Sequence, residues 1–342
     1  MKVGVLSGGG DAPGINAVIR AVVKKGIQTY GYEIIGIKDG WRGLIENELV
    51  PLDLNAASGI LPRGGSILGT SRTNPFKHEG DAEKILKNAK KAGIGAVVTI
   101  GGEDTLNVAY RLNKLGLKSV GVPKTIDNDL VGTDYTFGFM TAVTIATEAL
   151  DRLHTTAETH HRVIILEVMG RYTGWIALMA GLAGGADIIL IPEKPFVIEE
   201  VCKYIKQRQE RGRNFSIVVV AEGAKPKGGK EVVYSEAVDD FGHIRLGGIG
   251  YYLGKEIEKR LNIETRVVVL GHLQRGGSPT AFDRVLATRF GIEAVDLIQK
   301  RKFGYMVALQ GNKIVSVPLK DVIGKQKTVD LELYDIASVF FG

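Results

Sequence analysis

The sequence predicts an α/β protein with two lobes, each built around a mainly parallel sheet. Its 342 residues, 44% of them hydrophobic, exceed what one compact core usually needs. Short apolar runs alternate with stretches of helical periodicity, which is the pattern of a parallel sheet covered by helices. The 45 glycines suit loops that approach a ligand closely. Disorder and coiled coil both fit this composition poorly.

Eight apolar runs have the length of buried strands, and seven segments between them indicate helices. The expected strands are Val3–Leu6, Ile34–Ile37, Ala96–Ile100, Val120–Val122, Val163–Val168, Ile188–Ile191, Ile217–Val220 and Val267–Leu270. The expected helices are Ala17–Lys25, Ala82–Lys91, Leu106–Lys114, Thr141–His154, Glu199–Glu210, Leu253–Leu261 and Pro279–Lys300. The stretch Gly223–Gly247 is rich in glycine and charge and has neither period, so we expect an excursion or mobile loop there.

The charge balance favours small anionic ligands over nucleic acid. The chain has 44 basic and 38 acidic residues, a net charge of +6, and its basic clusters are short and lack interleaved aromatic residues. No run of about 18 apolar residues occurs, so we expect no membrane partner and a cytoplasmic location. The single cysteine, Cys202, lies in an amphipathic run and is typical of a buried structural thiol.

One design occurs twice: a strand, a glycine-rich turn and a helix. The two turns are Gly8–Asp11, with sequence GGGD, and Gly101–Asp104, with sequence GGED. Such turns present backbone N–H groups at a helix N-terminus and can bind phosphate, although tight strand-to-helix packing would explain either one alone. Carboxylates beside bound phosphates ordinarily need a cation between them. Glu103 is therefore a candidate ligand for Mg²⁺, with a solvated acid at a helix N-terminus as the alternative.

The segment Pro123–Asp129, with sequence PKTIDND, follows an expected strand, and ligands favour the carboxyl ends of strands in open α/β sheets. Thr125, Asp127 and Asp129 alternate along it, and an extended chain would direct all three to one face. A carboxylate there can take a proton from an attacking hydroxyl group. A polar turn of the Asx type would explain the same residues without any chemistry.

Taken together, these segments resemble the bacterial phosphofructokinase family over nearly the full chain. The matching motifs are GGGDAPGIN, RGGSILGTSR ending at Arg72, IGGEDT, PKTIDND, HHRVIILEVMGR, VAEG and VLGHLQRGGSPTAFDR. The resemblance implies two doubly wound, mainly parallel three-layer lobes. A phosphoryl-donor lobe would contain residues 1–138 and about 274–324, and a sugar-phosphate lobe about 139–273 and 325–342.

The resemblance also implies residue roles. Asp127 would be the general base acting on the 1-hydroxyl of fructose 6-phosphate, assisted by Asp129, Arg171 and Lys124. The expected sugar-site residues are Thr125, Ile126, Arg162, Met169, Gly170, Glu222, Arg266, His272, Leu273, Gln274 and Arg275. The expected donor-site residues are Gly10, Arg72, Gly102, Asp104, Thr105 and Lys124. Because the family places Arg162 and Arg266 across a subunit boundary, a homodimer or homotetramer with a shared sugar-phosphate site is implied.

Two positions bear on the phosphoryl donor. ATP-using relatives have glycine after the acidic metal ligand, whereas Asp104 would crowd and repel the α-phosphate of a nucleotide. Pyrophosphate-dependent members carry lysine at the position of Lys124, an ammonium group suited to a small, highly charged donor. Lysine also occurs there in some ATP-using members, so the prediction depends on Asp104 and Lys124 together. The predicted reaction is reversible transfer from pyrophosphate to fructose 6-phosphate, giving fructose 1,6-bisphosphate.

Three other functions stay open at the level of sequence. If the chain is an ATP-dependent 6-phosphofructokinase, every residue keeps the role given above and only the phosphoryl donor differs. A non-catalytic sugar-phosphate sensor would bind fructose 6-phosphate without turning it over. NAD and lipid kinases share a similar Gly-Gly-acid-Gly turn, but this chain adds a second glycine-rich turn and the sugar-phosphate arginines.

Overall fold

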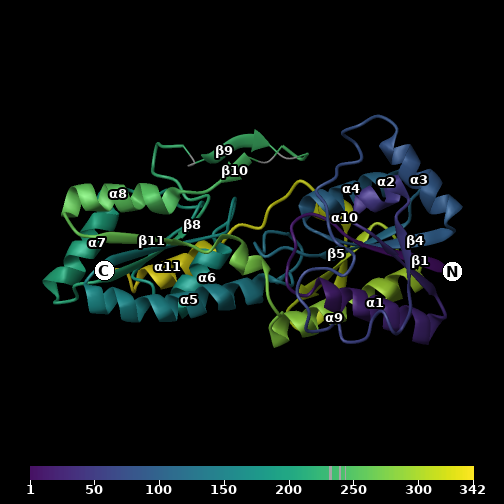
Figure 1. Cartoon of the computed structure of the whole chain (residues 1–342), viewed down its shortest axis with the longest axis horizontal. Helices are drawn as coiled ribbons and strands as arrows, with labels where there is room; N and C mark the ends of the chain where they lie inside the picture. Colours follow the sequence, from purple (N-terminus) through teal and green to yellow (C-terminus); the bar gives the residue numbers. More distant parts are fainter. Residues whose placement is uncertain (231–232, 239, 243) are drawn as a thin grey trace. The chain divides into compact units, whose positions relative to one another are not determined.

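The structure is a computed structural model that describes residues 1–230, 233–238, 240–242 and 244–342 (Figure 1). The chain divides into two compact units. The first unit contains residues 1–140, 239–243 and 275–326, and the second contains residues 141–238, 244–274 and 327–342. Each unit has its own sheet and its own hydrophobic core, so each is described by itself.

A seven-stranded sheet with the order β13-β12-β5-β4-β1-β2-β3 forms the centre of the first unit. Its strands are β1 (Lys2–Ser7), β2 (Glu33–Ile37), β3 (Leu49–Leu52), β4 (Ile94–Gly101), β5 (Ser119–Pro123), β12 (Tyr305–Gln310) and β13 (Lys313–Pro318). Neighbouring strands are parallel except at the two edges, where β3 and β13 run antiparallel to their neighbours. The central strands are nearly continuous apolar runs because both of their faces are buried.

Helices cover both faces of this sheet and make three layers (Figure 1). One face packs against α1 (Ile15–Tyr30) and α9 (Ala281–Gln299). The other packs against α2 (Trp41–Glu46), α3 (Asp81–Lys91), α4 (Glu103–Lys114) and α10 (Leu319–Val322). Successive residues of a strand point to opposite faces, so Val5 joins the core under α1 and α9 while Leu6 joins the core under α3 and α4.

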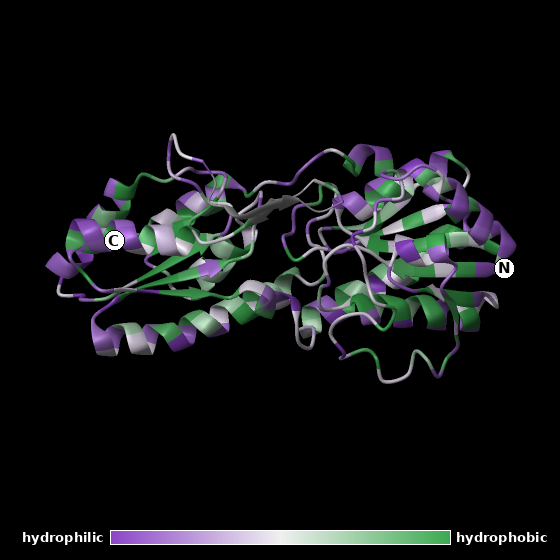
Figure 2. Cartoon of the chain, turned by 45° about the horizontal axis from the view of Figure 1, so that its top comes forward, coloured by the Kyte–Doolittle hydropathy of each residue, from purple (hydrophilic) through white to green (hydrophobic). Residues whose placement is uncertain are grey.

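The second unit has a parallel four-stranded sheet with the order β11-β6-β8-β7. Its strands are β6 (Val163–Val168), β7 (Ile188–Leu190), β8 (Ser216–Ala221) and β11 (Thr265–Val269). One face packs against α7 (Ile198–Glu210) and α8 (Ile249–Leu261), and α5 (Phe139–His160), α6 (Trp175–Ala183) and α11 (Leu331–Ser338) lie on the opposite side (Figure 1). A 3₁₀ helix, η1 (Gly271–Arg275), follows β11. In Figure 2 the strands of both sheets are mostly hydrophobic, while the helices alternate hydrophobic and hydrophilic residues.

The predicted fold class is confirmed, as are all eight expected strands and all seven expected helices. The stretch Gly223–Gly247 contains a regular element that the sequence did not predict, the antiparallel pair β9 (Val233–Val238) and β10 (Ile244–Leu246), which forms a two-stranded sheet of its own. Residues 231, 232, 239 and 243 of that stretch lie outside the described residues. Across the described residues, no helix combines the length and the apolar character needed to cross a membrane.

Candidate active site

Three loops meet at the carboxyl edge of the first unit's sheet, because β5, β4 and β1 are adjacent and parallel. They are residues 8–11 after β1, 101–104 after β4 and 124–129 after β5. The backbone N–H of Gly8 donates to the carbonyl of Ile100 at 2.9 Å, which joins the first loop to the end of β4, where the second loop begins. The two glycine-rich turns predicted from the sequence are therefore neighbours.

Their glycines serve different purposes. A Cβ on Gly8 would lie 2.8 Å from the side chain of Thr105, and one on Gly101 would lie 2.3 Å from it, so tight packing alone requires these two glycines. A Cβ on Gly10 would instead lie 2.8 Å from Nη1 of Arg275. At Gly102 a Cβ would meet no atom closer than the carbonyl oxygen of Lys124, at 3.6 Å. Packing therefore explains Gly8 and Gly101, whereas Gly102 has free space beside it that packing does not use.

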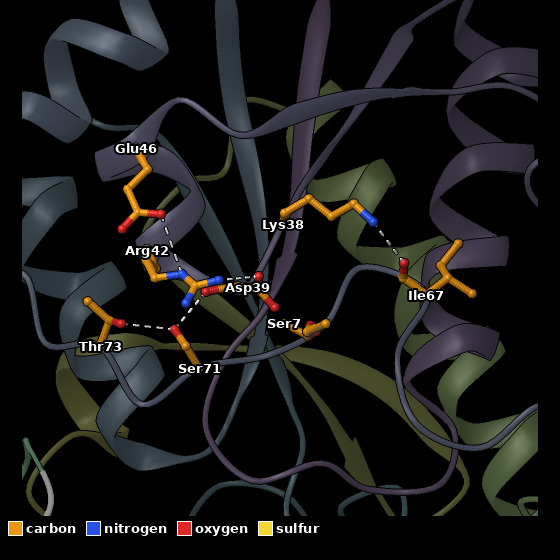
Figure 3. A network of polar contacts seen from close by, with 9 residues as sticks. Ser7, Lys38, Asp39, Arg42, Glu46, Ile67, Ser71 and Thr73 are labelled. Carbon is orange, nitrogen blue, oxygen red and sulfur yellow. Dashed lines mark hydrogen bonds and ion pairs between the residues drawn. The ribbon is translucent and has the colours of Figure 1, made fainter.

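The loop of residues 63–74 lies over the first turn and brings Arg72 beside it. The N–H of Gly9 donates to the carbonyl of Ser71 at 2.9 Å, and Thr70 Oγ1 donates to the carbonyl of Gly9 at 2.7 Å. Figure 3 shows how Ser71 is held: its hydroxyl donates to the carbonyl of Asp39 at 2.6 Å. The charge of Arg72 acts on Lys124, so this loop contributes a cation to the site.

Lys124 is the buried cation of the site, with 3% of its surface exposed. Its Nζ donates a hydrogen bond to the carbonyl oxygen of Gly10. Burial, followed by the positive charge of Arg275, lowers the pKa of Lys124 to about 7, and the carboxylates of Asp11 and Asp127 offset this only in part. The amine therefore titrates near neutral pH, and an anion placed beside it would favour its charged form.

Thr125, Asp127 and Asp129 are brought together by a turn, whereas we expected an extended chain. The N–H of Asp127 donates to Oγ1 of Thr125 at 3.1 Å. Asn128 has a left-handed backbone with φ of 52°, and its side-chain oxygen accepts from the N–H of Thr136 at 3.0 Å. The polar turn and the cluster of carboxylates are therefore one structure, since the turn directs both aspartates to the same place.

The two carboxylates of this turn interact. Burial, followed by the charge of Asp127, raises the pKa of Asp129 to about 7, while hydrogen bonds from the backbone, Thr125 and Gln326 favour its ionised form. The proton that binds as the pH falls therefore belongs to the pair, and the ionised state of a carboxylate is the one that a general base requires.

Glu103 begins α4, and its Oε1 accepts a hydrogen bond from the N–H of Gly324 at 3.1 Å. Among the described residues, no group of three or more His, Cys, Asp or Glu side chains could hold a metal ion. Mg²⁺ that arrives with phosphates needs only one or two carboxylates and keeps water in its other positions. A single carboxylate at the head of a phosphate-binding turn fits this chemistry.

In the second unit the expected sugar-phosphate residues fall at opposite ends of the sheet. Met169, Gly170 and Arg171 follow β6, Glu222 follows β8, and His272, Leu273 and Gln274 lie in η1 after β11. The N–H of Gly223 donates to the carbonyl of Gly170 at 3.1 Å, so the loops after β6 and β8 are joined. The side-chain oxygen of the fully buried Gln274 accepts a hydrogen bond from the N–H of Met169 at 3.2 Å. Gln274 therefore positions the backbone of the loop after β6.

Arg162 and Arg266 form the second group, at the amino ends of β6 and β11. Nε of Arg162 donates to Glu264 at 2.5 Å, and Arg266 also donates to Glu264. Hydrogen bonding by Arg162 lowers the pKa of Glu264. The six residues of β6 separate Arg162 from Met169 by roughly 20 Å, so one chain does not bring the two groups together.

The chain matches the family model described as "Phosphofructokinase" over residues 2–298. It is 60% identical over 343 residues to "Pyrophosphate--fructose 6-phosphate 1-phosphotransferase" of Streptomyces coelicolor, with all of both chains covered. It is 54% identical to "ATP-dependent 6-phosphofructokinase 2" of Clostridium perfringens, covering 97% of this chain and 94% of that one. Phosphofructokinase from Saccharomyces cerevisiae matches with a TM-score of 0.83 and 32% identity, over 94% of this chain and 45% of that chain.

The chain belongs to the phosphofructokinase family. The solvent exposure of three expected site residues of this phosphofructokinase decides whether their side chains are accessible to a ligand. Ile126 is fully buried, so it could line a site only through its backbone. Leu273 is 68% exposed and His272 is exposed, so both are accessible on η1.

Sequence reasoning missed three charged or polar residues of this phosphofructokinase. Asp11, whose charge acts on Lys124, stands next to Gly10 in the first motif and could have been found there. Gln326 helps to lower the pKa of Asp129, and Glu264 binds both arginines at the amino end of the second sheet. No local pattern marks either of these two, because each meets its partner through the fold.

Proposed function

We propose that this phosphofructokinase transfers a phosphoryl group from inorganic pyrophosphate to the 1-hydroxyl of fructose 6-phosphate, reversibly, giving fructose 1,6-bisphosphate and phosphate. The observation that carries the proposal is the buried amine of Lys124, which bonds to the Gly10 carbonyl between the two glycine-rich turns. A compact ammonium group at that position suits a small, highly charged donor. The reaction belongs to glycolysis and gluconeogenesis, and we place it in the cytoplasm.

Asp104 supports the same donor. It stands in the first turn of α4, two residues after Gly102, where a nucleotide would need space for its α-phosphate. A carboxylate against a polyphosphate in a poorly hydrated site costs roughly a few kcal/mol. Pyrophosphate ends before that position and avoids the cost. The full-length relative from Streptomyces coelicolor, whose name states pyrophosphate as the donor, agrees with this assignment.

In the proposed reaction the 1-hydroxyl oxygen of the sugar attacks the terminal phosphorus of pyrophosphate. The new O–P bond forms as the bridging P–O bond breaks, and the leaving phosphate takes the bonding electron pair. Asp127 accepts the hydroxyl proton, a contribution of about 10²–10⁴ in rate. Lys124 and Arg72 stabilise the negative charge that spreads over the transferring group. No covalent intermediate with the enzyme forms.

Glu103 would hold Mg²⁺ through one carboxylate, directly or through water. The ion, when bound, neutralises charge on the donor's phosphates and orients them. Gly10 and the Gly102–Thr105 turn would present backbone N–H groups to the same phosphates at the N-terminus of α4. These residues supply donor binding, while the chemistry at the acceptor depends on Asp127.

We propose a homodimer or homotetramer, and the separation of the sugar-phosphate residues supports it. Arg162 and Arg266 lie at the opposite end of the sheet from Arg171 and Glu222. Guanidinium groups are needed around the dianionic 6-phosphate of the sugar. We propose that a second copy of the chain supplies Arg162 and Arg266 to each sugar-phosphate site.

A coupled assay of the purified enzyme with fructose 6-phosphate and Mg²⁺ tests the proposal, with pyrophosphate and ATP supplied in separate reactions. We expect kcat/KM to be at least tenfold higher with pyrophosphate. A higher value with ATP would overturn the donor assignment. ATP is the alternative donor because the relative from Clostridium perfringens is named as ATP-dependent. Fructose 6-phosphate binding without turnover on any donor would instead favour a sensor.

A further inference from the structure

The loop 169–174 of the second unit joins β6 to α6 and begins with the expected sugar-site residues 169–171. The bond from the N–H of Met169 to the buried Gln274 holds its first residue. At the other end, the loop stops at Gly174, the N-cap of α6, which has no side chain to cap the helix. The position of that end therefore depends on a group from elsewhere in the unit.

Glu193, three residues after the end of β7, supplies this group. Both oxygens of its carboxylate accept from the N–H of Gly174, at 3.1 Å for Oε1 and 3.0 Å for Oε2. The negative charge lies at the N-terminus of α6, where the helix dipole favours it. A Cβ on Gly174 would lie 2.3 Å from Cγ2 of Ile191, so only glycine permits this close approach. Glu193 therefore fixes the point at which the loop ends and α6 begins.

The same carboxylate binds the C-terminal segment of the chain. Oε1 of Glu193 also accepts from the N–H of the buried Val329 at 3.0 Å. Nearby, Nε1 of Trp175, the first residue of α6, donates to the carbonyl of Lys327 at 3.0 Å. α11 packs on α6 and β7 (Figure 1), and the hydroxyl of Tyr334 donates to a backbone carbonyl of β7 at 3.0 Å. The C-terminal segment thus helps to hold the carboxylate that holds the loop.

We propose that Glu193 is a positioning residue of the sugar-phosphate site, which keeps the loop 169–174 in the conformation that binds fructose 6-phosphate. The inference rests on the proposed function, because it takes this loop as part of that site. The carboxylate acts through the backbone, since the N–H groups of Gly174 and Val329 occupy its oxygens. A loop that is ordered before the sugar arrives loses little conformational entropy on binding, so its order contributes to affinity.

Calorimetric titration of the full-length enzyme with fructose 6-phosphate tests the proposal. Glu193→Ala removes both acceptor oxygens, so the Kd should rise about tenfold, because binding must then order the loop. Glu193→Gln keeps one acceptor oxygen but replaces the other with an NH₂ group, which cannot accept from Gly174, so its Kd should rise less, by about threefold. The Kd of pyrophosphate should stay within about twofold in both variants, because the expected donor-site residues lie in the first unit.

Two controls separate positioning from stability. Tyr334→Phe removes a buried hydrogen bond of the same unit and should lower the melting temperature while leaving the Kd of fructose 6-phosphate within about twofold of wild type. Lys194→Ala changes the exposed neighbour of Glu193 and should also leave that Kd within about twofold.

The inference is overturned if both Glu193 variants bind fructose 6-phosphate as tightly as wild type, or no more weakly than Tyr334→Phe. An equal loss of pyrophosphate affinity would overturn it as well, because the effect would then not be confined to the sugar site. The proposed function fails on a different result, namely a wild-type enzyme that does not turn over fructose 6-phosphate.

Discussion

Binding of pyrophosphate should be accompanied by proton uptake at Lys124. Burial and Arg275 lower the pKa of this amine to about 7 in the free enzyme. Pyrophosphate brings several negative charges beside Nζ and should raise that pKa well above 8. The number of protons taken up then equals the fraction of neutral amine before binding, which is about 0.1 at pH 6, about 0.5 at pH 7 and about 0.9 at pH 8.

Isothermal titration calorimetry in buffers of different ionisation enthalpy measures this uptake, because the apparent binding enthalpy changes linearly with the buffer's enthalpy. Lys124→Arg is the matched control, since a guanidinium keeps the charge and does not titrate in this range. Proton changes of pyrophosphate itself are common to both proteins and cancel in the difference. The reasoning is refuted if wild type and Lys124→Arg take up the same number of protons at pH 7 and pH 8.

Three further predictions concern single substitutions. Asp127→Ser should leave fructose 6-phosphate affinity within a fewfold of wild type in a direct binding assay but reduce kcat by at least 10²–10⁴, and equal losses of both would contradict its role as base. Asp104→Gly should admit ATP and give measurable ATP-dependent turnover; none would mean that other residues exclude the nucleotide. Lys124→Met should raise the free energy of unfolding at pH 6.5, measured with urea, because the folded state no longer buries an amine whose pKa falls from 10.5 to about 7. That shift sets an upper limit of roughly 5 kcal/mol, reduced by the lost bond to Gly10, and the wild-type protein should gain stability between pH 7 and pH 10.

The fold could be predicted where residues within one segment determine the structure. Doubly buried strands such as β6 contain only apolar residues apart from Glu167, and helices such as α3 have acidic residues in the first turn and lysines in the last. The antiparallel edge pair β12 and β13 was missed, although the two-residue turn Gly311-Asn312 between them is a hairpin signal. β9 and β10 were missed because glycine and charge dominate that stretch.

The candidate site was predictable to the extent that its residues stand in local motifs. Lys124 and Asp127 follow β5, so their place at the carboxyl edge of the sheet follows from the sequence order alone. The contact of Arg275 with the first glycine-rich turn joins positions more than 260 residues apart and could not be derived from spacing. The same is true of Gln326 with Asp129, and of Glu264 between Arg162 and Arg266.

The central claim, that pyrophosphate is the donor, has its most direct test in the reverse reaction. Purified enzyme is incubated with fructose 1,6-bisphosphate, inorganic phosphate and Mg²⁺ in the complete absence of nucleotides, and the products are followed by ³¹P NMR. The account predicts that pyrophosphate and fructose 6-phosphate appear in equal amounts, because phosphate alone can accept the phosphoryl group. If no pyrophosphate forms while addition of ADP yields ATP from the same mixture, the donor is ATP and the account is wrong.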